Sequence, residues 1–154
     1  MIRFIKILSG ILLFVSSYKG FCQVGINTTT PISTLDLNGN LSVKTIGITT
    51  PLLGGPSGGA TLIDDGVYIS LTPVPPNNIQ FYLNDPTTLP GRVYILRNIT
   101  DFDTAELYTA GGKRFFHKSS NVGSAIGAPI YLPTNSAGKS IIIISDGANW
   151  TYFD

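Results

Sequence analysis

The chain has 154 residues, of which 12% are charged and 43% hydrophobic, and its formal net charge is +1. Lysine and arginine are scattered along it, which argues against a nucleic-acid partner because neutralising phosphates requires clustered basic side chains. Many β-branched and aromatic residues with few charges indicate strands rather than disorder, in one domain with an extension.

The first 22 residues have the features of an export signal. Arg3 and Lys6 supply a positive start, and the apolar run 7–15 is too short to span a bilayer as a helix. Small residues stand three positions and one position before Gln23. We therefore expect cleavage between Cys22 and Gln23, no transmembrane anchor after the leader is removed, and an exported location: secreted, on the cell surface or in the periplasm of a Gram-negative bacterium.

Cys22 is the only cysteine, so the cleaved chain would contain no disulfide. A lipidated Cys22 is the alternative, but that chemistry needs small residues just before the cysteine, and Phe21 stands there. The leader also carries three of the ten basic residues. Its removal leaves seven basic against nine acidic residues, a net charge of −2.

Residues 23–60 are rich in threonine, proline and glycine and are expected to be extended. The stretches 35–37 and 41–43 alternate like strands on either side of Asn38-Gly39-Asn40, and Asn-Gly favours a tight reversal. The run 51–61 predicts a linker, because Pro51 and several glycines disfavour regular pairing. Ordering a backbone costs about 1–2 kcal/mol per residue, so residues 23–62, which have few apolar side chains, would need contacts from elsewhere to be ordered.

Residues 61–154 are expected to form a compact β module. The stretches 67–72 and 79–84 each alternate between apolar and other residues, as a strand with one buried face does. The segment 73–78, PVPPNN, predicts a turn between them. The next run, 92–98, is apolar on both faces at its centre, which predicts a central strand.

The end of the module predicts further strands and a closing hairpin. Residues 103–116 suggest two short strands around a glycine pair. The isoleucine run 141–145 is expected to be buried on both sides and to pair with 150–153 through the turn 146–149. Helix should be minor. The sequence thus predicts an all-β fold of short antiparallel strands, as a β-sandwich, roll or fibre-type module, preceded by an extended N-terminal segment.

Residues 24–40, VGINTTTPISTLDLNGN, resemble VGIGTTxPxxxLDVNGN, a motif of phage tail-fibre and tail-spike proteins and of many secreted proteins of Gram-negative bacteria. Asn27 replaces a glycine of the motif, a mild departure because asparagine tolerates positive φ, and Leu37 replaces a valine. The resemblance implies an extended, often trimeric β protein without a particular activity. The matching residues are Val24, Gly25, Ile26, Thr28, Thr29, Pro31, Leu35, Asp36, Asn38, Gly39 and Asn40.

The C-terminal part resembles the terminal modules of fibre-like secreted proteins. In those modules a strand that ends in asparagine precedes a glycine turn and a closing DGxNW hairpin. Asp146, Gly147, Asn149 and Trp150 match that closing pattern. This resemblance implies a secreted structural or adhesive β protein.

Sequence patterns that suggest catalysis or cofactor binding are weak. AGKS at 137–140 lacks the earlier glycine of a phosphate loop and precedes a strand, whereas a phosphate loop precedes a helix. His117 is the only histidine, without cysteines to share a zinc ion, and we expect an exposed strand end there. The pairs Asp64-Asp65 and Asp101/Asp103 could bind calcium but are more typical of turns. We therefore expect no catalytic, cofactor-binding or metal-binding residue.

Two features bear on surface function. The triplet Asp103-Thr104-Ala105 matches a short bacterial O-glycosylation motif, with Thr104 as acceptor. Aromatic residues could form a sugar-stacking platform or pack across strands. These residues are Tyr82, Tyr94, Tyr108, Phe115, Phe116, Tyr131, Trp150 and Tyr152.

Together these patterns predict an exported, non-enzymatic structural or adhesive protein. We expect it to be fibre-like and to self-associate, as a homotrimer, with a cell-surface glycan as a candidate ligand. The alternative is a monomeric carbohydrate-binding or adhesion module of the β-sandwich type. A row of at least two exposed aromatics on one sheet face would favour this alternative.

Overall fold

The computed structural model describes residues 23–154. The predicted leader and its cleavage after Cys22 lie outside the described residues. The chain divides after Ser42 into two compact units. We call residues 23–42, the described part of the first, unit 1, and residues 43–154 unit 2.

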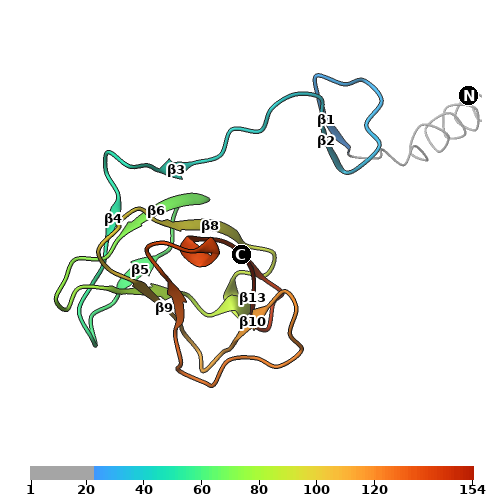
Figure 1. Cartoon of the computed structure of the whole chain (residues 1–154). Helices are drawn as coiled ribbons and strands as arrows, with labels where there is room; N and C mark the ends of the chain where they lie inside the picture. Colours follow the sequence, from blue (N-terminus) through green and yellow to red (C-terminus); the bar gives the residue numbers. More distant parts are fainter. Residues whose placement is uncertain (1–22) are drawn as a thin grey trace, which may run out of the picture. The chain divides into compact units, whose positions relative to one another are not determined.

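Unit 2 consists of short strands joined by turns, which confirms the predicted all-β fold (Figure 1). Its first strands are β3 (Thr45–Ile46), β4 (Leu52–Leu53), β5 (Thr61–Ile63), β6 (Tyr68–Thr72) and β7 (Gln80–Leu83). They are followed by β8 (Val93–Asn98), β9 (Ala105–Thr109), β10 (Phe115–His117), β11 (Ile130–Leu132), β12 (Ser140–Ser145) and β13 (Trp150–Phe153). The 3-10 helices η1 (Pro86–Thr88) and η2 (Ala137–Lys139) are single turns.

From β4 to β12 the strands alternate between two sheets along the chain. The first sheet has the order β10-β13-β12-β8-β6-β3, with β4 also on β6, and the second has the order β11-β9-β7-β5. From β4 to β9 each strand pairs in parallel with the second strand after it, β4–β6–β8 in one sheet and β5–β7–β9 in the other. The centre of unit 2 is therefore a roll in which the chain passes back and forth between two sheets, and neighbouring strands within each sheet run parallel.

The expectation of antiparallel strands is wrong for this centre. Antiparallel pairs occur where β12 meets β8 and β13, and where β11 meets β9. Parallel neighbours need a long crossover connection. Here that connection is a strand of the opposite sheet, so short spacings between turns coexist with parallel pairing.

The core lies between the two sheets. Trp150, Tyr94 and Phe81 are the largest of its fully buried side chains. The rings of Tyr94 and Trp150 lie 6.0 Å apart, and the Trp150 indole N–H donates to the carbonyl of Asn84. Because its N–H keeps a hydrogen bond, the Trp150 ring can be buried without a cost for its polar group, and its burial stabilises the packing of the two sheets.

The predicted closing hairpin is confirmed, since β12 and β13 pair with Ile143 opposite Tyr152 and Ser145 opposite Trp150. The expectation that the isoleucine run is buried on both sides is wrong. Ile141 and Ile143 are buried, whereas 44% of Ile142 is exposed. β12 has the core on one face only, so alternate side chains face outward.

The expected linker belongs to unit 2. β3 and β4 pair with β6, and Gly55 forms a bridge with Gln80. A Cβ on Gly54 would lie 2.3 Å from the carbonyl oxygen of Asn78. The glycines here thus permit close packing, and the compact unit begins at residue 43 rather than at the expected 61.

Unit 1 contains β1 (Val24–Ile26) and β2 (Leu35–Leu37), which pair in parallel. The expected reversal at 38–40 does not form a hairpin, because β2 pairs with the preceding strand and residues 41–43 are not in a strand. Asn27, which replaces the motif glycine, has a φ of 59°, as the sequence led us to expect.

The motif residues hold the loop between β1 and β2. The Asn27 side-chain amide donates to the Asn38 carbonyl at 3.1 Å, and Asn38 returns a bond to the Asn27 carbonyl. Asp36 accepts a bond from the backbone N–H of Ile32 at 2.9 Å. A Cβ on Gly25 would lie 2.5 Å from the Thr28 carbonyl oxygen. These polar contacts fix the loop but bury few apolar groups.

Candidate functional site

The outer face of the second sheet carries polar and aromatic side chains in two cross-strand rows. In one row Leu62, Tyr82 and Tyr108 are register partners on β5, β7 and β9. In the other, Gln80, Glu106 and Tyr131 are partners on β7, β9 and β11. The residues between them in sequence, such as Phe81 and Leu107, are buried in the core, so these six side chains face outward. We call this surface the tyrosine face.

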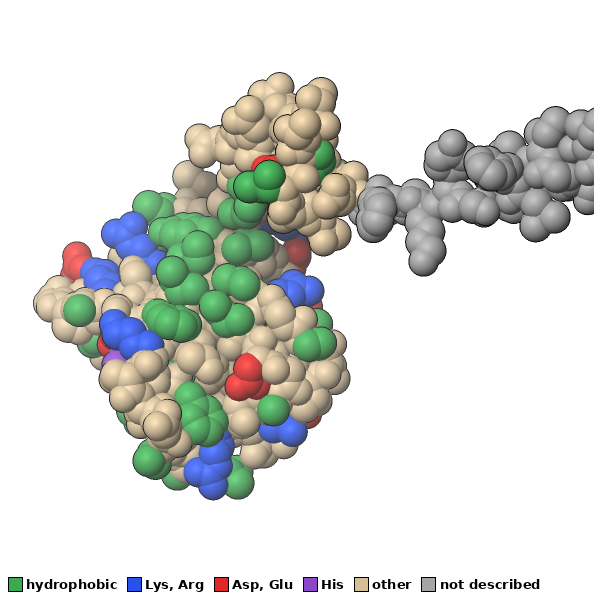
Figure 2. All heavy atoms as spheres, turned by 90° about the vertical axis from the view of Figure 1, so that its right-hand side faces the viewer, with side chains coloured by type: hydrophobic (Ala, Val, Ile, Leu, Met, Phe, Trp, Pro, Cys, Tyr) green, Lys and Arg blue, Asp and Glu red, His purple; other side chains and the backbone are tan. Residues whose placement is uncertain are grey.

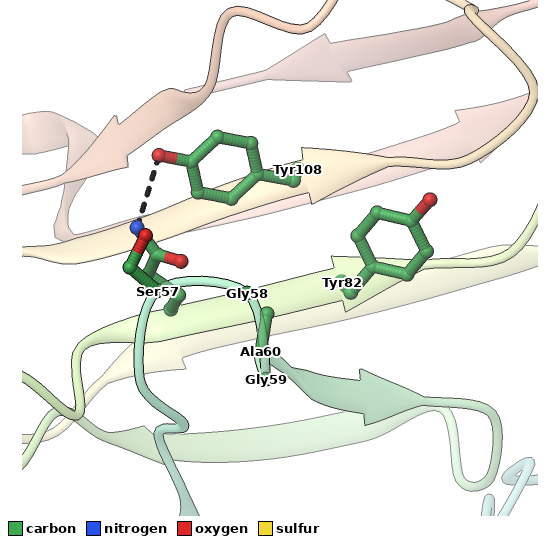
Figure 3. Close-up of a pocket in the computed structure, with 7 residues that line it drawn as sticks. Ser57, Gly58, Gly59, Ala60, Tyr82 and Tyr108 are labelled. Atoms are coloured by element: carbon green, nitrogen blue, oxygen red, sulfur yellow. Dashed lines mark hydrogen bonds between the residues drawn. The ribbon is translucent and has the colours of Figure 1, made fainter.

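An open pocket of about 500 Å³ lies on the tyrosine face. Gln80, Tyr82 and Tyr108 line it on the sheet, and the loop 57–60 forms its side. Figure 3 shows the two tyrosine rings on neighbouring strands, set apart and with their hydroxyls pointing in opposite directions. The pocket falls in the size range of small-ligand sites and combines aromatic with polar groups, as such sites do.

A hydrogen-bond network holds the floor of this pocket. The Gln80 Nε2 donates to Glu106 Oε2 at 2.9 Å and lies 3.2 Å from the Tyr108 hydroxyl. That hydroxyl donates to the same carboxylate oxygen at 2.9 Å. Burial, together with this bond to Glu106, raises the pKa of Tyr108 to about 12, so its hydroxyl stays protonated and donating. The network fixes the orientation of the Tyr108 ring before any ligand binds.

The predicted aromatic set divides between the core and the surface. Tyr94, Phe115 and Trp150 are buried, and the ring of Tyr152 packs against His117 with centroids 5.2 Å apart. Tyr82, Tyr108 and Tyr131 lie on the tyrosine face, and Tyr131 is 60% exposed. The remaining member, Phe116, is half-buried at β10. Only Tyr131 of the three tyrosines on this face is exposed, whereas Tyr82 and Tyr108 are half-buried, so the row of at least two exposed aromatics expected of a carbohydrate-binding module is not fully formed.

His117 belongs to a surface cluster at the end of β10. Its Nδ1 lies 2.7 Å from the Ser119 hydroxyl and its Nε2 lies 3.0 Å from Asp154 Oδ1. Hydrogen bonds from His117 and Lys118 lower the pKa of Asp154 to about 2. Because Lys118 also binds Asp154 and Ser119 is a sequence neighbour, we interpret the cluster as a clasp between β10 and the residue after β13.

The other candidate carboxylates bind nearby groups of the chain. Asp65 pairs with Lys44, Asp101 pairs with Lys139 at 2.5 Å, and Asp103 accepts the N–H of Thr104 at 2.8 Å. Within residues 23–154 no three potential metal ligands gather in one place. The AGKS segment forms η2 and leads into β12, so it presents no helix N-terminus to a phosphate.

The residues of the closing pattern shape the hairpin. Asp146 Oδ1 accepts the backbone N–H of Ala148 and of Asn149, Gly147 has a φ of 86°, and Asn149 accepts the N–H of Arg114. With Trp150 buried, these roles are architectural rather than ligand-binding.

One cross-strand row on the outer face of the first sheet is apolar. Phe153, Ile142, Ile95 and Tyr68 are successive register partners across β13, β12, β8 and β6. Figure 2 shows a face of unit 2 on which hydrophobic side chains gather in a continuous patch. Exposed apolar patches of this kind mark interaction surfaces.

The chain matches no protein family, and searches of curated proteins and of solved structures also find no match. No helix within residues 23–154 has the length and apolar character needed to cross a membrane.

Sequence reasoning missed part of the tyrosine face. Gln80 and Glu106 were not selected as site residues, although their alternation with Phe81 and Leu107 marks them as outward-facing. Their partnership depends on the parallel register of β7 and β9, which the sequence pattern does not reveal.

Proposed function

We propose that this protein is a non-enzymatic adhesion protein that is exported and binds a glycan on its tyrosine face. The observation that carries the proposal is the pocket lined by Tyr82, Tyr108 and Gln80, in which Glu106 bonds to the Gln80 amide and the Tyr108 hydroxyl. The resemblance of the chain's two ends to fibre-like secreted proteins supports an adhesive rather than a catalytic role.

Sugar binding suits this surface on physical grounds. The apolar face of a pyranose ring can stack on a tyrosine ring, which offers a large and rigid contact area. The ring hydroxyls need donors and acceptors at the rim, and Gln80, Glu106 and the tyrosine hydroxyls supply both. Because the network already orders these groups, binding would lose little side-chain entropy.

A glycan array probed with residues 23–154 tests this proposal. We expect binding to a restricted set of glycans, and a loss of about tenfold or more in affinity for Tyr82→Ala, as for an aromatic anchor of a binding site. Tyr68→Ala is the matched control, since Tyr68 lies on the outer face of the other sheet. Absence of binding to every glycan, or equal loss in both variants, would refute the proposal.

Self-association is a second candidate function, and the exposed apolar side chains of unit 1 favour it. Ile32 is 92% exposed and Leu35 61%, and Val24 and Ile26 on β1 are also exposed. An isolated pair of three-residue strands is marginal at best in water. A second copy of the chain would cover these residues, and the fibre motif that they belong to favours a trimer.

Light scattering after size exclusion tests self-association. We expect residues 23–154 to have the mass of a trimer, and a truncated protein that begins at Val43 to be a monomer with unchanged β-rich circular dichroism. Starting at Val43 keeps β3 and β4, which belong to unit 2. A monomeric mass for residues 23–154 at high micromolar concentration would exclude this candidate function.

A further inference from the structure

We propose that the glycan bound on the tyrosine face is not anionic, and that the Glu106 carboxylate sets this preference. The inference rests on the proposed glycan-binding function and adds the chemical class of the ligand. It follows from the charge of the site and from the hydrogen-bonding atoms left free there.

No charged residue of the described chain lines the pocket itself, and Glu106, which is bonded to Gln80 and Tyr108 of the lining, is the one ionisable acid of the network. An anionic sugar, such as a uronate or a sialic acid, would place its carboxylate near this acid without a basic partner. Like charges brought together in a binding site repel each other, so anionic glycans are disfavoured.

The free hydrogen-bonding atoms suit hydroxyl groups. Glu106 Oε2 already accepts bonds from Gln80 and Tyr108. The second carboxylate oxygen and the Gln80 amide oxygen make no hydrogen bond to another described residue, so they remain free to accept. Adjacent sugar hydroxyls can donate to two such acceptors and still accept from the amide N–H or a tyrosine hydroxyl.

Paired glycans test the preference. The probes are β-1,3-glucan, β-1,4-mannan and β-1,4-galactan, each compared with its C6-oxidised uronate form. We expect the protein to bind at least one neutral member, and to bind its charged counterpart at least about tenfold more weakly.

Glu106→Gln distinguishes a charge effect from a fit effect, because it removes the charge and keeps an acceptor for Tyr108. We expect this variant, whatever its affinity for the neutral glycan, to bind the uronate form within about threefold of that affinity. Equal binding of neutral and uronate forms by the unaltered protein, or an unchanged discrimination in Glu106→Gln, would overturn the inference. Binding to none of the probes or array glycans would instead refute the proposed function.

Discussion

Replacing Ile143 with aspartate is expected to unfold unit 2, whereas the same change at Ile142 is expected to leave it folded. Ile143 is fully buried between the sheets on the central strand β12, next to β8 and β13. A carboxylate there would be buried without a partner, which costs several kcal/mol, a large part of the stability of a domain this size. Ile142 has the same backbone and strand neighbours, but its side chain faces outward.

Urea denaturation followed by tryptophan fluorescence measures both variants, because Trp150 is the only tryptophan and is fully buried. We expect Ile142→Asp to change the free energy of unfolding by about 1 kcal/mol or less. A stable Ile143→Asp protein would mean that the inward face of β12 is misassigned, and with it the packing of the first sheet on the second.

The second large effect is expected at Asn98, the last residue of β8. Its side chain is fully buried, and its amide donates to the carbonyls of Asp103 and Leu132 at 2.8 and 2.9 Å. Its oxygen accepts the backbone N–H and the hydroxyl of Thr100. Asn98→Ala would leave several of these groups without partners, at about 1–3 kcal/mol for each buried one. We expect a total loss of about 3 kcal/mol or more.

Asn135→Ala is the control for this substitution, because Asn135 is exposed in the turn before η2. Thermal unfolding by circular dichroism should give a much lower midpoint for Asn98→Ala and a nearly unchanged one for Asn135→Ala. Equal midpoints for the two variants would contradict the role assigned to Asn98. This role also gives a physical reason for an asparagine at the end of that strand.

Local patterns predicted the elements of this fold better than their connections. The alternation of 67–72 and 79–84 and the Asp146-Gly147 turn identify strands and a hairpin because each depends on neighbours in sequence. The parallel roll depends on which strands meet across distant turns. The run 51–61 was misread because glycine permits close packing as well as flexibility, and only the neighbouring chain, here Asn78, decides between them.

The candidate site shows the same division. The aromatic residues could be selected from the sequence as a set, but burial alone separates Trp150 and Tyr94 from Tyr82 and Tyr108. Glu106 is an ordinary acidic residue in the sequence. It becomes part of a site because the register of β7 with β9 places it opposite Gln80.

The most direct test of the account locates the bound glycan on the protein. The measurement is a titration of isotope-labelled residues 43–154 with the strongest glycan from the array, followed by two-dimensional amide NMR. We expect chemical-shift changes confined to the loop 57–60 and to β7, β9 and β11, with the amides of Gln80, Tyr82, Glu106 and Tyr108 among the largest. Changes centred instead on the outer face of β12 and β13, with the tyrosine face unaffected, would contradict the assignment of glycan binding to this surface.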